Sequence, residues 1–98
     1  MRIGGELRPL HAGENIIGRD REAAIVVDSP DVSRHHARLL VTSDAVMLED
    51  LGSKNGTFVA GKRLSAATAV RDGDQITVGR TLLRIERLRD VASTATAP

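Results

Sequence analysis

The chain of 98 residues has no cysteine, no tryptophan and no tyrosine, and it has a single phenylalanine, Phe58. The absence of cysteine excludes disulfides, thiolate nucleophiles and cysteine-ligated metal centres. A single aromatic ring makes the chain poorly suited to stacking nucleic-acid bases. The longest apolar run, residues 23–27, is far too short to cross a membrane, and the N-terminus lacks the apolar core of a signal peptide. We therefore expect a cytoplasmic domain.

Charge of neither sign dominates the sequence, since 14 Lys and Arg accompany 13 Asp and Glu. This balance argues against a dedicated nucleic-acid clamp or a polybasic membrane anchor. Hydrophobic residues make up 41% of the chain, which is enough for one folded core. We expect a domain over residues 1–90, followed by a small, polar, disordered tail or linker over residues 91–98.

What the sequence does contain favours β-strands, because Val, Ile and Thr together account for 22 of its 98 residues. Apolar residues alternate along 37–41, 46–48 and 75–78, and turn residues such as Asn55-Gly56 separate the short segments. No window shows a sustained helical stripe. This pattern predicts an antiparallel β-sandwich or barrel, with its loops gathered at the two ends.

Sequence motifs for nucleotide hydrolysis are incomplete. Residues 56–62 match G-x-x-x-x-G-K, but Arg63 stands where Ser or Thr would ligate magnesium. Residues 13–18 resemble the same motif without its lysine, and neither segment leads into an expected helix. Nucleotide chemistry is therefore a weak alternative.

Metal binding and hydrolase chemistry are also poorly supported. His35 and His36 are adjacent on an expected strand, so their side chains point to opposite faces and cannot easily share a metal ion. We expect one of them to be buried and the other exposed. Ser33, His36 and Asp50 could form a catalytic triad, but the G-x-S-x-G elbow is absent. We expect no metal, no cofactor and no intrinsic catalysis.

Three short motifs occur in order at expected loop–strand junctions: Gly18-Arg19, then Ser33-Arg34-His35-His36, then Asn55-Gly56-Thr57. In this combination the chain resembles the forkhead-associated (FHA) domain, whose pattern is G-R, S-x-x-H and N-G. The resemblance extends over roughly residues 6 to 87. It implies a β-sandwich of about eleven strands that binds phosphothreonine peptides through loops at one end.

The resemblance also implies which residues hold the phosphopeptide. Arg19, on the loop after the second strand, would pair its guanidinium with the phosphate. Ser33 would bind phosphate oxygens through its hydroxyl and backbone amide. Arg34 and Lys54 would add further phosphate contacts, and Asn55 would hold the peptide backbone.

Four other positions match family residues that support the binding loops: Gly18, His36, Gly56 and Thr57. By resemblance, His36 is a mostly buried imidazole that ties the loops together. Gly56 would permit the positive φ of its turn.

The family also links the residue two before the binding serine to peptide selectivity. Here it is Asp31, which should disfavour acidic peptide residues and favour basic ones.

Several functions remain open from the sequence. The leading interpretation is a phosphothreonine-dependent binding module that acts downstream of a Ser/Thr protein kinase. The sequence is rich in Ala and Arg, which is typical of bacterial proteins, so we expect a bacterial kinase. One alternative is an FHA-like scaffold that binds its partner without phosphorylation. A small enzyme, a nucleic-acid-binding protein or a membrane-binding domain is less favoured.

Overall fold

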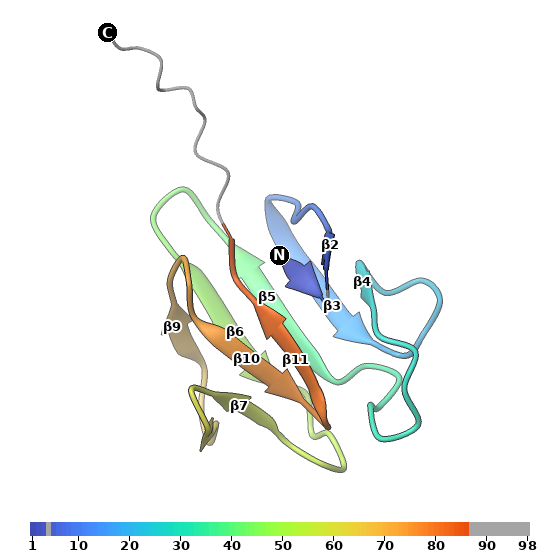
Figure 1. The fold of residues 1–98 in the computed structure, drawn as a ribbon. Helices are drawn as coiled ribbons and strands as arrows, with labels where there is room; N and C mark the ends of the chain where they lie inside the picture. The colour runs from blue at the N-terminus through green and yellow to red at the C-terminus, as the bar shows by residue number, and fades with distance from the viewer. Residues whose placement is uncertain (4, 87–98) are drawn as a thin grey trace, which may run out of the picture.

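The computed structural model describes residues 1–3 and 5–86, and within them every regular element is a β-strand (Figure 1). The strands are β1 (Arg2–Ile3), β2 (Glu6–Leu7), β3 (Gly13–Gly18), β4 (Ile25–Val26), β5 (Ala37–Val41), β6 (Val46–Asp50), β7 (Thr57–Val59), β8 (Lys62–Arg63), β9 (Thr68–Val70), β10 (Gln75–Val78) and β11 (Thr81–Arg84). The expectation of an all-β fold with about eleven short strands is confirmed.

The strands form two sheets that face each other, as Figure 1 shows. One sheet has the order β2-β1-β11-β10-β7-β8, and the other has the order β4-β3-β5-β6-β9. All strand pairs are antiparallel except β3 and β4, which pair in parallel. The sandwich is therefore antiparallel with one short parallel edge.

The core lies between the sheets and is built from alternate residues of each strand. Ile17 and Leu39 of the second sheet are fully buried, as are Ile76, Val78 and nearly all of Leu83 from the first. This alternation follows from the period of two in a strand, which sends neighbouring side chains to opposite faces. The expected inward positions of the segments 37–41 and 75–78 match this arrangement.

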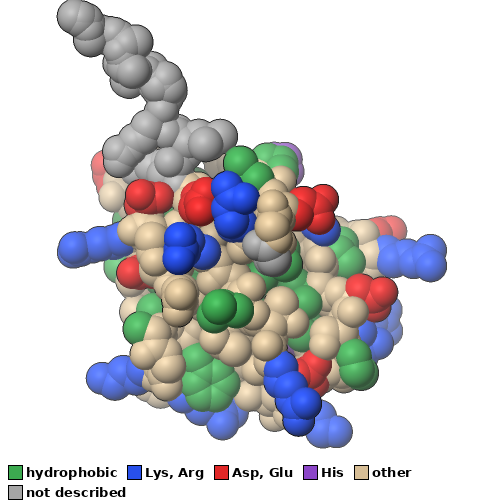
Figure 2. Space-filling model, in the orientation of Figure 1, with side chains coloured by type: hydrophobic (Ala, Val, Ile, Leu, Met, Phe, Trp, Pro, Cys, Tyr) green, Lys and Arg blue, Asp and Glu red, His purple; other side chains and the backbone are tan. Residues whose placement is uncertain are grey.

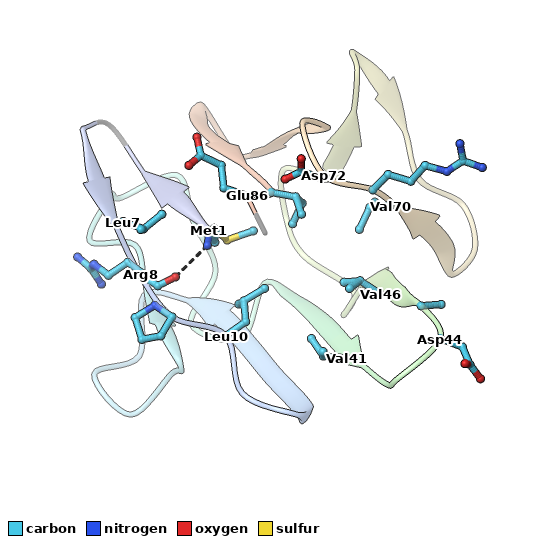
Figure 3. Close-up of a pocket in the computed structure, with 14 residues that line it drawn as sticks. Met1, Leu7, Arg8, Leu10, Val41, Asp44, Val46, Val70, Asp72 and Glu86 are labelled. Atoms are coloured by element: carbon cyan, nitrogen blue, oxygen red, sulfur yellow. Dashed lines mark hydrogen bonds between the residues drawn. The ribbon is translucent and has the colours of Figure 1, made fainter. Parts of the chain in front are cut away.

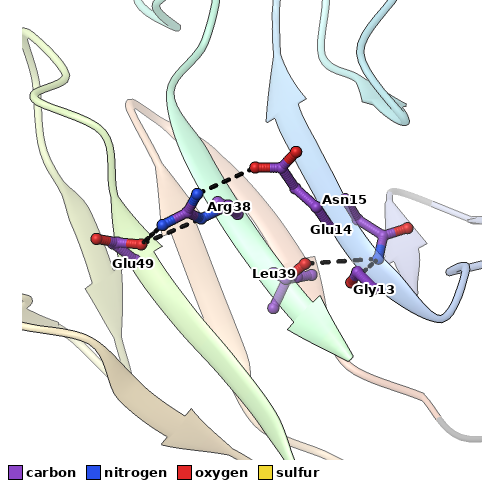
Figure 4. Close-up of polar contacts among 6 residues, drawn as sticks. All are labelled: Gly13, Glu14, Asn15, Arg38, Leu39 and Glu49. Carbon is purple, nitrogen blue, oxygen red and sulfur yellow. Dashed lines mark hydrogen bonds and ion pairs between the residues drawn. The ribbon is translucent and has the colours of Figure 1, made fainter. Parts of the chain in front are cut away.

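The outer face of the β3-β5-β6 sheet carries a charged ladder (Figure 4). Arg38 on β5 donates from Nη1 to Glu14 Oε2 on β3 at 3.0 Å, and from Nε to Glu49 Oε1 on β6 at 3.1 Å. Arg38 sits directly opposite Glu49 in the register, so opposite charges meet across the strands. This contact supports the register that places Leu39 in the core.

No helix that could span a membrane occurs among the described residues. The expected domain boundary at residue 90 and the expected tail over 91–98 lie outside the described part of the chain.

Candidate functional site

Three loops that carry the sequence motifs meet at one end of the sandwich. They are the first loop (residues 19–24, after β3), the second loop (27–36, before β5) and the third loop (51–56, before β7). The lower end of the molecule in Figure 1 contains the third loop and the turn between β10 and β11. Arg19 thus follows the third strand and not the second, because the N-terminal residues add a short hairpin of β1 and β2.

Gly18 allows the first and second loops to touch. The Arg19 amide donates to the Ser33 carbonyl at 3.0 Å, and the Asp20 amide donates to the Arg34 carbonyl at 3.2 Å. A Cβ atom on Gly18 would lie 1.9 Å from the Arg34 carbonyl oxygen, so a larger residue cannot occupy this position without moving the backbone. A glycine here is thus required by close packing of backbone against backbone.

Only one nitrogen of the Arg19 guanidinium, Nε, is hydrogen-bonded among the described residues. Its Nε donates to the Val32 carbonyl at 2.9 Å. The hydrogen bonds and ion pairs found among the described residues use neither of its terminal Nη groups, and the residue is exposed. This arrangement holds the guanidinium beside the second loop while leaving its paired donors for a ligand.

Ser33 is held by a residue of its own loop and by the third loop. Its backbone amide donates to Nδ1 of His36 at 3.0 Å, and its Oγ accepts from the Lys54 amide at 3.1 Å. The hydroxyl hydrogen remains able to donate outward. The sequence-based expectation that the Ser33 amide also binds phosphate does not match this geometry, because that amide is already bonded to the imidazole.

His36 is fully buried, whereas 62% of the His35 side chain is exposed, which matches the expectation for the two adjacent histidines. Nε2 of His36 lies 2.7 Å from the Gly56 carbonyl oxygen. The ring therefore spans from the second loop to the third. Gly56 has φ of +89°, a conformation that glycine adopts without strain.

Asn55 makes a second link between these loops. Its Nδ2 donates to the Asp31 carbonyl at 2.7 Å. Only one of the two amide hydrogens is needed for this bond, so the other hydrogen and the Oδ1 acceptor stay available at an exposed position. Asn55 is thus pre-oriented at the surface beside Ser33 and Lys54.

An acidic residue at the end of β6 organises the third loop, and sequence reasoning gave it no such role. Asp50 Oδ2 accepts from the Ser53 amide at 3.0 Å, and Oδ1 accepts from the hydroxyls of Ser53 and Thr57 at 2.5 and 2.6 Å. Ser53 Oγ in turn accepts from the Gly56 amide at 2.9 Å. The D-x-x-S spacing is a local turn signal that could have indicated this anchor.

These hydrogen bonds also affect the charge of Asp50. Burial by itself raises the pKa of the Asp50 carboxyl, but the donors from Ser53 and Thr57 outweigh it and hold the pKa below its ordinary value. Thr57 is fully buried, and the hydrogen bond from its hydroxyl to Asp50 ties β7 to the residue that organises the third loop.

Arg34 lies beside an acid on the first loop. Its Nη2 is 3.9 Å from Asp20 Oδ2, and His35 Nε2 is 3.1 Å from the same oxygen. The Glu22 amide, more than these two side chains, lowers the pKa of Asp20, so the carboxylate stays ionised. The Arg34 side chain is 73% exposed and can turn toward a ligand.

Cations gather at the loop end of a nearly neutral molecule. Lys and Arg side chains stand along the lower edge of Figure 2, the end where the third loop lies in Figure 1. A hollow of about 580 Å³ opens there beside Asn55 and Lys54.

Within residues 1–3 and 5–86, no group of three or more His, Asp and Glu side chains is placed to hold a metal ion.

A second cavity, of about 550 Å³, contains none of the motif residues (Figure 3). Its wall includes Met1, Leu10, Val41, Val46 and Val70. It is mainly apolar, and its charged lining residues are of both signs: Arg8, Asp44, Arg71, Asp72 and Glu86.

The three loops thus bring an arginine whose terminal Nη groups are unused among the described residues and a serine hydroxyl to one end of the β-sandwich. The sequence profile of the FHA domain matches residues 15–79, and the chain belongs to the FHA domain family.

Individual relatives agree with this assignment. The transcriptional regulatory protein EmbR of Mycobacterium tuberculosis is 41% identical over 70 residues, which are 71% of this chain and 18% of that protein. The solved structure of EmbR in complex with a low affinity phosphopeptide has a TM-score of 0.80 at 36% identity, covering 85% of this chain and 22% of that one. This chain therefore spans about a fifth of that relative's length.

A further solved structure comes from a structural and functional study of phosphothreonine-dependent FHA domain interactions. It has a TM-score of 0.81 at 31% identity and covers 86% of each chain. The fold therefore matches over most of the chain.

Proposed function

We propose that this protein binds phosphothreonine-containing peptides through the three loops. One observation carries the proposal: the Arg19 amide donates to the Ser33 carbonyl and Arg19 Nε donates to the Val32 carbonyl. These two bonds hold a guanidinium with unused Nη groups against the loop that carries Ser33. A phosphothreonine carries about −1.5 to −2 charge and three acceptor oxygens, which suit this set of donors.

Each side chain has a role in this proposal. Arg19 pairs with two phosphate oxygens through charge-assisted hydrogen bonds, and Ser33 donates its hydroxyl. Arg34 and Lys54 supply positive charge from the neighbouring loops. Asn55 uses its remaining amide donor and acceptor to hold the peptide backbone. Gly18, His36, Gly56 and Thr57 keep the loops in place.

The relatives support this function. EmbR was solved with a phosphopeptide, and the other matched FHA domain comes from work on phosphothreonine-dependent interactions. We infer that a Ser/Thr protein kinase phosphorylates the partner, that the domain acts in the cytoplasm of a bacterium, and that it binds without catalysing a reaction. FHA domains are binding modules, which is consistent with this inference.

The test is fluorescence polarisation with a degenerate phosphothreonine peptide library, run beside matched phosphoserine and unphosphorylated pools. We expect micromolar binding that requires phosphothreonine. Arg19→Ala should weaken it more than tenfold, since charge-assisted bonds are lost. Arg21→Ala, which removes an exposed arginine from the same loop, is the matched control and should bind normally.

The alternative is an FHA-like scaffold that binds its partner without phosphorylation. It would be supported by a partner whose binding ignores phosphorylation and survives Arg19→Ala. No specific contact of the loops favours it over the phosphothreonine proposal.

A further inference from the structure

The first loop carries an acid directly after the arginine of the proposed phosphate site. Asp20 follows Arg19 in the chain, and only 21% of its side chain is exposed. Its backbone amide donates to the Arg34 carbonyl at 3.2 Å, so the acid lies against the second loop. A negative charge beside residues that would bind a phosphate opposes the binding of that second anion, because like charges repel.

One carboxylate oxygen of Asp20 shapes its own loop. Oδ1 accepts from the Glu22 amide at 2.9 Å, and the Asp20 carbonyl accepts from the Ala23 amide at 3.0 Å. Asp and Asn side chains both favour a tight turn of this kind. The turn needs an acceptor oxygen at this position but not a charge, so it does not by itself explain a carboxylate there.

The other carboxylate oxygen faces two side chains of the second loop. Oδ2 lies 3.1 Å from His35 Nε2 and 3.9 Å from Arg34 Nη2. The Glu22 amide holds the pKa of Asp20 below its ordinary value, so the carboxylate is ionised and can only accept. His35 Nε2 is therefore a donor. The contact with Arg34 is too long for a hydrogen bond and is an ion pair only.

Arg34 is thus the partner that can leave this acid. Its side chain is 73% exposed, and a long, exposed ion pair is weak. When Arg34 turns away, Asp20 keeps the bonds from the Glu22 amide and from His35. A phosphothreonine carries more negative charge than one carboxylate and can take Arg34 from it. The domain without its ligand therefore offers Arg34 a weak internal anion.

We propose that Asp20 is an internal competitor of the phosphate, which holds Arg34 before the ligand binds and thereby lowers the affinity of the site. This inference rests on the phosphothreonine proposal and adds how the strength of that binding is set. A competitor of this kind keeps the complex readily reversible. It also fixes the sign of the test, since removing a competitor tightens binding, whereas removing a residue that only supports the loop weakens it.

The test measures the affinity for the degenerate phosphothreonine peptide pool by fluorescence polarisation. The variants are Asp20→Asn, Arg34→Ala and the two combined. Asn removes the charge and keeps an acceptor for the Glu22 amide. Asp20→Ser is a second neutral variant, whose hydroxyl can also accept in such a turn. Glu22→Gln is the matched control, because it neutralises an exposed acid on the same loop. Thermal melts establish that each variant is folded.

We expect Asp20→Asn to tighten binding about three- to fivefold, a change typical of an exposed charge pair. Asp20→Ser should change the affinity in the same direction. Arg34→Ala alone should weaken binding, and adding Asp20→Asn to it should recover less than about twofold, because the cation for which the two anions compete is gone. Glu22→Gln should leave the affinity within about twofold of the wild-type value.

Three results would overturn the inference. The first is unchanged or weaker binding by both neutral variants of Asp20 when they are folded. The second is a full gain from Asp20→Asn without Arg34, which would mean direct repulsion of the phosphate. The third is an equal gain from Glu22→Gln, which would mean a general effect of charge. In each of these the wild-type domain still binds the pool, so the phosphothreonine proposal stands. Failure of the folded wild-type domain to bind the pool would contradict both.

Discussion

His36 and Gly56 are joined by a buried hydrogen bond of 2.7 Å, from the imidazole Nε2 to the carbonyl oxygen. The other ring nitrogen, Nδ1, accepts from the Ser33 amide. Because an amide can only donate, Nδ1 carries no hydrogen, and the ring is the neutral tautomer protonated at Nε2. One side chain thus fixes the distance between the loop that carries Ser33 and the loop that carries Asn55.

Replacing His36 by alanine should therefore destabilise the domain and weaken peptide binding together. The change leaves a cavity and two unpaired backbone groups, so we expect a loss of about 3 kcal/mol in the free energy of unfolding. Urea denaturation measures this loss. His35→Ala, at the exposed neighbouring position, should shift stability by less than about 0.5 kcal/mol. Equal effects of the two variants would contradict the bridging role of His36.

Gly18→Ala should be more damaging than its small size suggests. The added Cβ would meet the Arg34 carbonyl oxygen at 1.9 Å, so the first and second loops must separate. We expect a loss of about 2 kcal/mol or more in stability, and weaker phosphothreonine binding because Arg19 moves with the loop. Gly5→Ala is the matched control, since a Cβ atom at Gly5 meets nothing within 4 Å. Wild-type binding by Gly18→Ala would show that the loops tolerate the displacement.

Much of the fold could be predicted because it depends on local patterns. Alternation along residues 37–41 and 75–78 identified core faces that the structure shows as buried. The three motifs identified the loops that meet. The additional hairpin of β1 and β2 escaped prediction, since two-residue strands carry no periodic signal.

The contacts between loops could not be predicted from spacing. The Asn55 side-chain amide bonds the Asp31 carbonyl, and the Lys54 backbone amide bonds Ser33 Oγ. Both contacts depend on how the second and third loops approach each other. The direction of the Asp31 carboxylate depends on Ser29, two residues earlier, and on Arg80 from a distant turn. The sequence shows that Asp31 carries a charge, but it does not show which residues form the hydrogen bond and the ion pair with that carboxylate.

The Asp50 anchor predicts a specific acid sensitivity. Its pKa is lower in the folded chain than its ordinary value of about 3.9, so folding gains stability from the ionised form. This gain is fully present above the unfolded pKa and is lost as the pH falls through the lower folded pKa. Asp50→Asn should thus lower the thermal midpoint at pH 7, and its deficit against wild type should shrink as the pH falls below about 4. A deficit that stays constant to pH 3 would contradict the role of the charge.

Phosphopeptide binding should itself depend on pH and salt in a way that reports the phosphate. The second phosphate pKa is about 6, so the charge available to Arg19 and Arg34 falls as the pH drops below that value. We expect affinity for a phosphothreonine peptide to weaken severalfold between pH 7.5 and pH 5, and to weaken as salt screens the exposed cations. Thermal melts at each pH are the control, because they separate a change in the ligand from unfolding of the loops. Unchanged affinity across this range, with the protein folded throughout, would mean that the doubly charged phosphate is not the group that these loops recognise.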